Sequence, residues 1–313
     1  MNFKVINIVT ITGASLGMIG SLLIIIIYLY FRELRYLYRK LIFILSIYDF
    51  LQALSYLLPG QKSKLICYIQ FYMLSCFVSA PQFWSASISI LSYLKVVKGF
   101  SDLKLNKIQN WFHLLMWIKT FSTIWMAIFA TKPIQSKAYW CYSDNGKVTF
   151  VVYFFLWLYA IICLVFYILI MFRLRKIFKI VSRFDPFQRK NHLNKVWIQL
   201  RMSLIPLVYF IIIIPATIRR IREMLHYEKD IPTLDILHSL LITSQGFWDF
   251  WIFVIFDVEI RSKIRYCCSE YSRFRVTFNP EKDDDQQSPF TKDFLNQEKQ
   301  DNDSCYYSLV EMK

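Results

Sequence analysis

Three charged side chains, Asp49, Lys119 and Asp249, interrupt long apolar stretches of the chain. Each lies about eight residues from the cytosolic end of a predicted membrane-spanning helix, which places all three about 12 Å above the inner membrane boundary. A single charge at that depth costs about 2.5–3.5 kcal/mol on insertion scales, so each one needs a partner or has to be neutralised. We therefore predict that Asp49 faces the interior of a helix bundle and that Lys119 or Asp249 approaches it.

The two possible pairings imply different chemistry. An Asp49–Lys119 pair would be a structural ion pair. Asp49 and Asp249 together would instead hold a cation or share one proton, because two close carboxylates resist ionising together, and that arrangement could serve as a switch. Lys119 has a further alternative, since its long stem can carry the ammonium group to the inner lipid headgroups.

Cysteines form the second candidate site. Cys67 begins the third apolar run and Cys141 follows the fourth, so both are expected on the outer side, where disulfides persist. A Cys67–Cys141 disulfide is the preferred interpretation, and two unpaired thiols are the alternative. Cys267 and Cys268 follow the last run by about ten residues, beside basic residues, and are either a palmitoylation site or ordinary free thiols.

Basic residues and prolines mark the sixth apolar run. Guanidinium groups bind phosphate or carboxylate at two points, so an anionic ligand is one interpretation of an outer cluster, and contact with lipid headgroups is the other. The cluster comprises Arg219, Arg220 and Arg222. Pro206 and Pro215 each remove a backbone donor and are expected either to kink this helix into a lever or simply to be tolerated there.

Neither catalysis nor nucleic-acid binding is supported. The chain has no His-Glu-x-x-His, Gly-x-Ser-x-Gly or Walker motif and no clustered metal ligands, so we predict no enzyme, no cofactor and no metal. A net charge of +15 could indicate nucleic acid. However, the basic residues lie in short segments between apolar runs, where positive charge sets membrane orientation. Hydrophobic residues make up 56% of the chain and charged residues 19%, as in membrane proteins.

Seven apolar runs are long enough to cross a bilayer as helices, which takes about 20 residues each. Their continuous character excludes the alternating pattern of a membrane β-barrel. We therefore predict an all-α membrane protein with a seven-transmembrane helix bundle. The runs are approximately Ile6–Tyr30, Leu41–Leu58, Leu65–Val96, Trp111–Ala130, Val148–Met171, Val196–Thr217 and Thr233–Asp257.

The distribution of lysine and arginine predicts the orientation. Segments 32–40, 97–110 and 172–195 and the part after Asp257 together hold about twice as many of these residues as the opposite side, and the side with more of them is cytosolic. An odd number of spans then places the N-terminus outside and the C-terminus in the cytosol. Residues 1–265 are expected to form the bundle, ending in a short amphipathic helix or a frayed extension of the last span. Residues 266–313 are expected to form a disordered cytosolic tail.

Several short segments, taken in order, resemble the slime-mould cyclic-AMP receptor family of G-protein-coupled receptors and its receptor-like relatives. The third run ends without the Asp/Glu-Arg-Tyr of the rhodopsin family, and the seventh lacks its Asn-Pro-x-x-Tyr. Because Arg219-Arg220 stands where the slime-mould family has Asn-Arg, the resemblance implies the receptor class rather than cyclic AMP as ligand. The segments are Leu45–Asp49, Cys67–Gln70, Phe83–Ala86, Trp140-Cys141, Ile214–Arg220 and Gln245–Phe247.

The resemblance implies an extracellular ligand, a cytosolic heterotrimeric G protein as partner, and a multi-pass location in the plasma membrane. Candidate G-protein contacts lie at the predicted inner helix ends, where contact with anionic lipid is the alternative role. They are Arg32, Arg35, Tyr93, Lys95, Arg173, Arg175, Lys176 and Arg201. Two other functions stay open: a transporter or channel that uses the intramembrane charges, and a seven-span protein that binds partners without coupling to G proteins.

Overall fold

The computed structural model describes residues 3–31, 36–60, 62–130, 133–135, 140–143, 146–181, 204–219, 221–222, 231–257 and 260–264. The chain divides into two units, Met1–Arg261 and Ser262–Lys313, and nearly all described residues belong to the first. The predicted tail, including Cys267 and Cys268, lies outside the described residues, as do Arg32, Arg35, Arg201 and Arg220.

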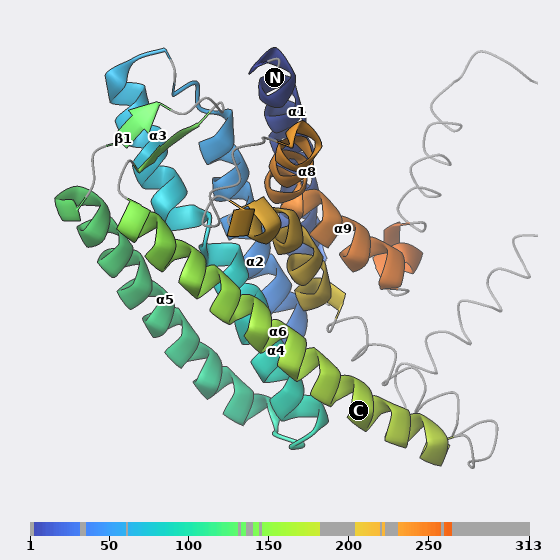
Figure 1. Ribbon diagram of the computed structural model, residues 1–313. Coiled ribbons are helices and arrows are strands. Elements are labelled where there is room, and N and C mark those ends of the chain that lie inside the picture. Colours follow the sequence, from blue (N-terminus) through green and yellow to red (C-terminus); the bar gives the residue numbers. More distant parts are fainter. Residues whose placement is uncertain are drawn as a thin grey trace, which may run out of the picture. The chain divides into compact units, whose positions relative to one another are not determined.

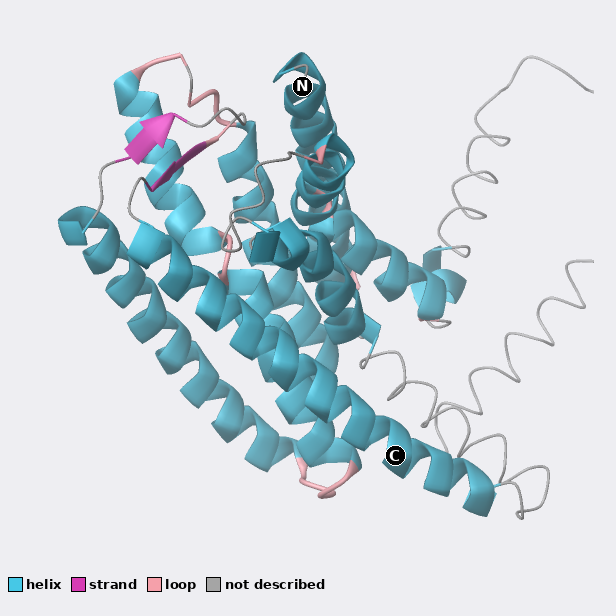
Figure 2. Ribbon diagram, in the orientation of Figure 1, coloured by secondary structure: helices cyan, strands magenta, loops and turns pink. Residues whose placement is uncertain are grey.

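Helices dominate the described residues (Figures 1 and 2). Four helical segments are long and apolar enough to cross a membrane, and Leu204–Arg219 is a shorter apolar helix. One short antiparallel hairpin, β1 paired with β2, follows α5. The elements are α1 (Phe3–Tyr30), α2 (Leu37–Leu57), α3 (Lys64–Phe77), α4 (Ala80–Val96), α5 (Asp102–Ala130), β1 (Pro133–Gln135), β2 (Cys141–Ser143), α6 (Gly146–Val181), the helix Leu204–Arg219, α8 (Pro232–Thr243) and α9 (Gln245–Phe256).

The third and seventh predicted spans are each divided into two helices, which corrects the expectation of one continuous helix in each. In the third, α3 ends at Phe77 and α4 begins at Ala80, with Pro81 in its first turn. Proline is well placed there because the first turn of a helix needs no backbone donor. In the seventh, α8 and α9 meet at Ser244.

Hydroxyl side chains accompany the break in the seventh span. Ser244 donates its Oγ hydrogen to the carbonyl of Leu240 at 2.7 Å, and Thr243 donates to the carbonyl of Ser239 at 2.7 Å. The carbonyl of Leu240 also accepts the backbone N–H of Ser244 at 3.0 Å, so the hydroxyl adds a second bond to it. Inside a bilayer, backbone groups at a break need partners from the protein, and the carbonyl of Ile242, in the last turn of α8, accepts one from the side chain of Gln52. The break is therefore compatible with a membrane-spanning position.

Glycines allow α1 to lie directly against the broken seventh span. A Cβ atom at Gly17 would lie 2.4 Å from the carbonyl oxygen of Thr243, and one at Gly20 would lie 2.6 Å from that of Gly246. Reciprocally, a Cβ atom at Gly246 would lie 2.6 Å from the carbonyl oxygen of Gly17. Such small-residue seams are how membrane helices gain close backbone packing. We call this contact the glycine seam.

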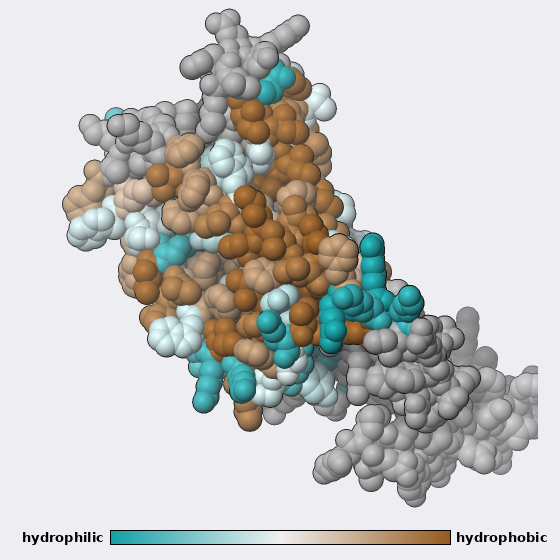
Figure 3. Space-filling model, turned by 60° about the horizontal axis from the view of Figure 1, so that its bottom comes forward, coloured by the Kyte–Doolittle hydropathy of each residue, from teal (hydrophilic) through white to brown (hydrophobic). Residues whose placement is uncertain are grey.

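The outside of the helices is largely apolar. Large hydrophobic side chains such as Trp111, Phe121 and Trp125 on α5 are about two-thirds exposed. Figure 3 shows a broad hydrophobic surface with hydrophilic residues gathered toward one edge. A polar interior behind such a surface is the arrangement expected of a protein whose solvent is lipid.

Candidate functional site

Two carboxyl groups meet inside the bundle. Asp49 of α2 is 2% exposed and Asp249 of α9 is 1% exposed, and their side chains are close enough to interact directly. Gly246 permits this approach, since a Cβ atom there would lie only 3.2 Å from that of Asp49. Within the described part of the chain, no group donates a hydrogen bond to either carboxylate oxygen of Asp49 or to Oδ2 of Asp249.

This geometry has a limited set of chemical outcomes. Two adjacent carboxylates without donors cannot both stay charged in a low-dielectric interior unless something positive lies between them. A shared proton or a bound cation would each satisfy the pair. The arrangement can therefore hold one exchangeable positive charge between α2 and α9.

Lys119 does not pair with Asp49. Its ammonium group donates to the hydroxyl of Ser79 at the break between α3 and α4. The structure thus brings Asp249, and not Lys119, to Asp49. Lys119 belongs to α5, and this contact places its ammonium group beside the C-terminal end of α3, where the helix dipole favours a cation.

Neutral glutamines extend the polar interior, a role that the sequence did not predict for them. Gln52, one turn from Asp49 on α2, donates from Nε2 to the carbonyl of Ile242 at 3.0 Å. Gln82 of α4 donates from Nε2 to Oε1 of Gln245 at 3.3 Å. This bond links the first turn of α4 to the first turn of α9. Their spacing from Asp49 and from the breaks could have indicated this role. However, an uncharged amide costs less to bury than a charge, so its presence in an apolar run does not by itself indicate a partner.

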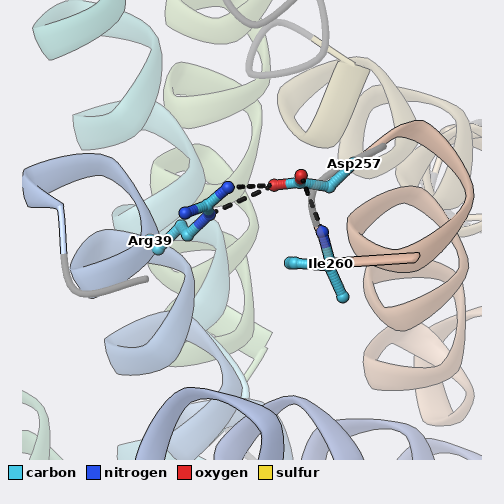
Figure 4. Close-up of polar contacts among 3 residues, drawn as sticks. All are labelled: Arg39, Asp257 and Ile260. Carbon is cyan, nitrogen blue, oxygen red and sulfur yellow. Dashed lines mark hydrogen bonds and ion pairs between the residues drawn. The ribbon is translucent and has the colours of Figure 1, made fainter. Parts of the chain in front are cut away.

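An ion pair ties α2 to the end of α9 (Figure 4). Arg39 donates from Nε at 3.1 Å and from Nη2 at 2.9 Å to Oδ2 of Asp257. The other oxygen of Asp257 accepts the backbone N–H of Ile260 at 3.3 Å, as an N-cap does. The carboxylate of Asp257 thus caps the helical residues 260–264 and also holds the end of α9 to α2. The sequence alone indicated no role for Arg39 beyond that of an orienting charge.

The opposite end of the bundle carries the predicted disulfide, which is confirmed. Cys67 of α3 is bonded to Cys141 of β2, with their Cα atoms 5.5 Å apart. The buried side chain of Gln70 lies beside it. Gln70 donates to the carbonyl of Leu58 at 2.7 Å and accepts the N–H of Cys141 at 3.0 Å. The loop after α5 is therefore fixed to both α2 and α3.

We expect replacement of Cys67 or Cys141 by serine to loosen this loop and to lower the thermal stability of the bundle. The cysteines are 74 positions apart, and a cross-link of that span contributes about 4 kcal/mol in the chain-entropy model. Thermal unfolding in detergent micelles measures the loss. The two single variants and the double variant should lose the same amount, because one bond is removed in each case. Thiol labelling of both residues in the intact protein would contradict the bridge.

The predicted basic cluster and the two prolines belong to the sixth predicted span. Arg219 forms an ion pair with Asp235 of α8 at 3.1 Å, so it already binds a carboxylate of its own chain. Arg222, its predicted neighbour in the basic cluster, is half-buried. Pro206 and Pro215 are buried in the helix Leu204–Arg219, which continues through both.

The predicted G-protein contacts that the structure describes lie on α4 and α6. The ring of Tyr93 packs at a tilt against that of Phe166, with the ring centroids 5.0 Å apart. Lys95 pairs with Asp102 at 2.6 Å on the surface. Three basic side chains near the end of α6 are exposed and able to meet a partner or lipid. They are Arg173, Arg175 and Lys176.

Curated relatives of the chain are receptors, although no protein-family model matches it. It is 29% identical over 144 residues to G-protein coupled receptor 1 of Arabidopsis thaliana, covering 46% of this chain and 43% of that protein. It is 27% identical over 239 residues to cyclic AMP receptor-like protein C of Dictyostelium discoideum, covering 68% and 62%. It is 23% identical over 279 residues to G-protein coupled receptor 157 of Homo sapiens, covering 83% of each.

The match thus spans less than half the length of the Arabidopsis protein and under two-thirds of the Dictyostelium protein. These relatives carry the names of receptors and not of enzymes. Their identity to this chain is low, but it confirms the resemblance that the sequence segments indicated. The chain is a multi-pass helical membrane protein similar to G-protein-coupled receptors, cyclic-AMP-receptor-like proteins among them.

Proposed function

We propose that this protein is a plasma-membrane receptor that transmits an extracellular chemical signal to a cytosolic heterotrimeric G protein. The observation that carries the proposal is the line of contacts between α2 and the seventh span. It runs from Gln52 and Ile242, through Asp49 and Asp249, to Arg39 and Asp257. A disulfide-fixed loop lies at one end of the bundle and this ion pair at the other.

The proposed mechanism is a shift between two conformations of the bundle. A ligand outside and a G protein inside influence each other only if each binds one conformation better than the other. The carboxyl pair supports such a shift, because moving Asp249 relative to Asp49 changes how well the pair retains a proton or cation. The N-terminus lies outside in this proposal, and Arg219 and Arg222 face the ligand side, where an anionic ligand would compete with Asp235 for Arg219.

The test is guanine-nucleotide exchange on co-expressed G proteins, measured with and without candidate ligands. Stimulated exchange would support the receptor function. Absence of exchange with every G-protein class, at normal surface expression, would favour a seven-span protein that binds other partners.

Charge reversal at the end of α6 should abolish coupling if this end contacts the G protein. We expect the triple change Arg173→Glu, Arg175→Glu and Lys176→Glu to reduce stimulated exchange at least about tenfold, because like charges across an interface cost several kcal/mol. The control is the double change Lys62→Glu and Lys64→Glu, at exposed positions where α3 begins, and it should leave exchange intact. Unchanged signalling by the α6 variant at equal surface expression would remove these residues from the G-protein surface.

One observation favours a second function. Transporters place their binding sites where discontinuous helices meet inside the membrane, and here the third and seventh spans are both discontinuous and are joined by Gln82 and Gln245. The carboxyl pair lies one turn beyond Gln245. Uptake of protons or sodium ions into proteoliposomes that contain the purified protein would distinguish a transporter from a receptor.

A further inference from the structure

Trp140, from the loop before β2, packs onto the helix bundle. It lies against a buried apolar cluster formed by Ala14 of α1, Tyr56 of α2 and Leu74 of α3, with Ile242 of α8 at its edge. Its ring meets that of Tyr56 edge to face, with the centroids 5.5 Å apart. A single loop side chain therefore contacts a cluster to which four helices contribute. We call this cluster the aromatic seat.

The position of Trp140 is fixed by its neighbour in the chain. Cys141 is bonded to Cys67 through its sulfur and donates its N–H to Gln70. These two constraints hold the backbone next to Trp140 against α3, so the ring reaches the seat with little freedom left to lose. Such preorganisation favours occupancy in the way that a tethered ligand is favoured over a free one.

The seat lies at one end of the line of contacts between α2 and the seventh span. Tyr56, Gln52 and Asp49 follow one another at helical spacing on a single face of α2. Ile242, which edges the seat, also accepts the hydrogen bond of Gln52. A change at the seat thus reaches α8 and α2 directly, about two helical turns from the carboxyl pair, with Gln52 between them.

We propose that Trp140 is an intramolecular ligand of this receptor, and that the aromatic seat is a binding site for a planar aromatic group. The proposal rests on the receptor function proposed above. Trp140 occupies the seat in the same conformation in which Arg39 and Asp257 are paired. By linkage, an occupant that binds one state better than the other stabilises the state it prefers. In this proposal Trp140 prefers the state seen here and thereby holds the inner ion pair closed. An aromatic ligand from outside activates the receptor by taking the place of Trp140 without stabilising the closed state equally.

Removing the ring should raise signalling in the absence of ligand. We expect Trp140→Ala to increase basal nucleotide exchange about fivefold or more, the lower end of typical coupling between two sites. Trp140→Phe keeps an aromatic ring and should stay near the wild type. Trp125→Ala, which removes a tryptophan that is 67% exposed on α5, is the matched control. Unchanged or lower basal exchange in Trp140→Ala would overturn the proposal.

A second measurement does not depend on any G protein. Indole should raise the melting temperature of detergent-solubilised Trp140→Ala, because it fills the vacated seat, and should leave the wild type and Trp125→Ala unchanged. If Trp140→Ala does not reach the membrane, Trp140→Leu replaces it, since leucine keeps apolar volume without a ring. No stabilisation of either variant by indole would overturn the seat. Stabilisation by indole without any nucleotide exchange would retain the seat and reject the receptor function.

Discussion

Replacement of Gly246 by valine will prevent the bundle from assembling. A Cβ atom at this position would lie 2.6 Å from the carbonyl oxygen of Gly17, 3.1 Å from the Cβ atom of Ser21 and 3.2 Å from that of Asp49. Two of these neighbours belong to α1 and one to α2, so no single side chain can move to make room. Overpacking of this kind costs about 3 kcal/mol or more when backbone is the obstacle.

The measurement is surface expression in cells together with the melting temperature of any protein recovered. Thr12→Val is the matched control, because it places the same branched side chain on the exposed side of α1. We expect near-complete loss of surface expression for Gly246→Val and no loss for Thr12→Val. Normal expression of Gly246→Val with an unchanged melting temperature would show that α1 and the seventh span do not touch as the glycine seam requires.

Removal of the Asp49 carboxylate will abolish the signalling response. Asparagine at position 49 keeps the volume but can neither share a proton with Asp249 nor hold a cation beside it. The two conformations then lose the difference in charge occupancy that the proposed switch uses, and we expect the ligand-stimulated response to fall at least about tenfold. Asp49→Ala should in addition change thermal stability, because it leaves Asp249 buried without its neighbour.

The response of nucleotide exchange to pH and to sodium concentration separates the two occupants of the pair. Wild-type exchange should depend on one of these variables, and Asp49→Asn and Asp249→Asn should both lose that dependence. Thr12→Val, on the exposed side of α1, is the control and should keep the dependence of the wild type. An Asp49→Ala protein with unchanged stability and unchanged signalling would eliminate the carboxyl switch.

Hydropathy predicted much of the fold because the cost of exposing backbone in lipid leaves helices as the natural spanning element for long apolar runs. It did not predict the breaks in the third and seventh spans. Pro81 and Gly246 mark both breaks in the sequence, but each residue is also tolerated within continuous membrane helices, so neither one is decisive. The orientation of the termini stays a prediction from the distribution of lysine and arginine.

The candidate site divides along a similar line. The disulfide and the proximity of Asp49 to Asp249 follow from common depth and common side, which a sequence contains. The pairing of Arg39 with Asp257 depends on which helices are neighbours, and no local pattern encodes that. Gln70 and Trp140 belong to segments that carry the family resemblance, but their roles could not be predicted, since each acts through contacts that only the folded loop creates.

The ion pair between Arg39 and Asp257 also bears on how the protein is made. The partners are 218 positions apart, and ribosomes add about 5–20 residues each second. The guanidinium of Arg39 therefore waits on the order of ten seconds or more for this carboxylate, while the intervening helices enter the membrane. The pair can close only on a chain synthesised through its last span. A chain truncated before Asp257 cannot form this ion pair, so its α2 lacks a contact that the longer chain has. Such a chain should be less stable and should be degraded by cellular proteases more readily.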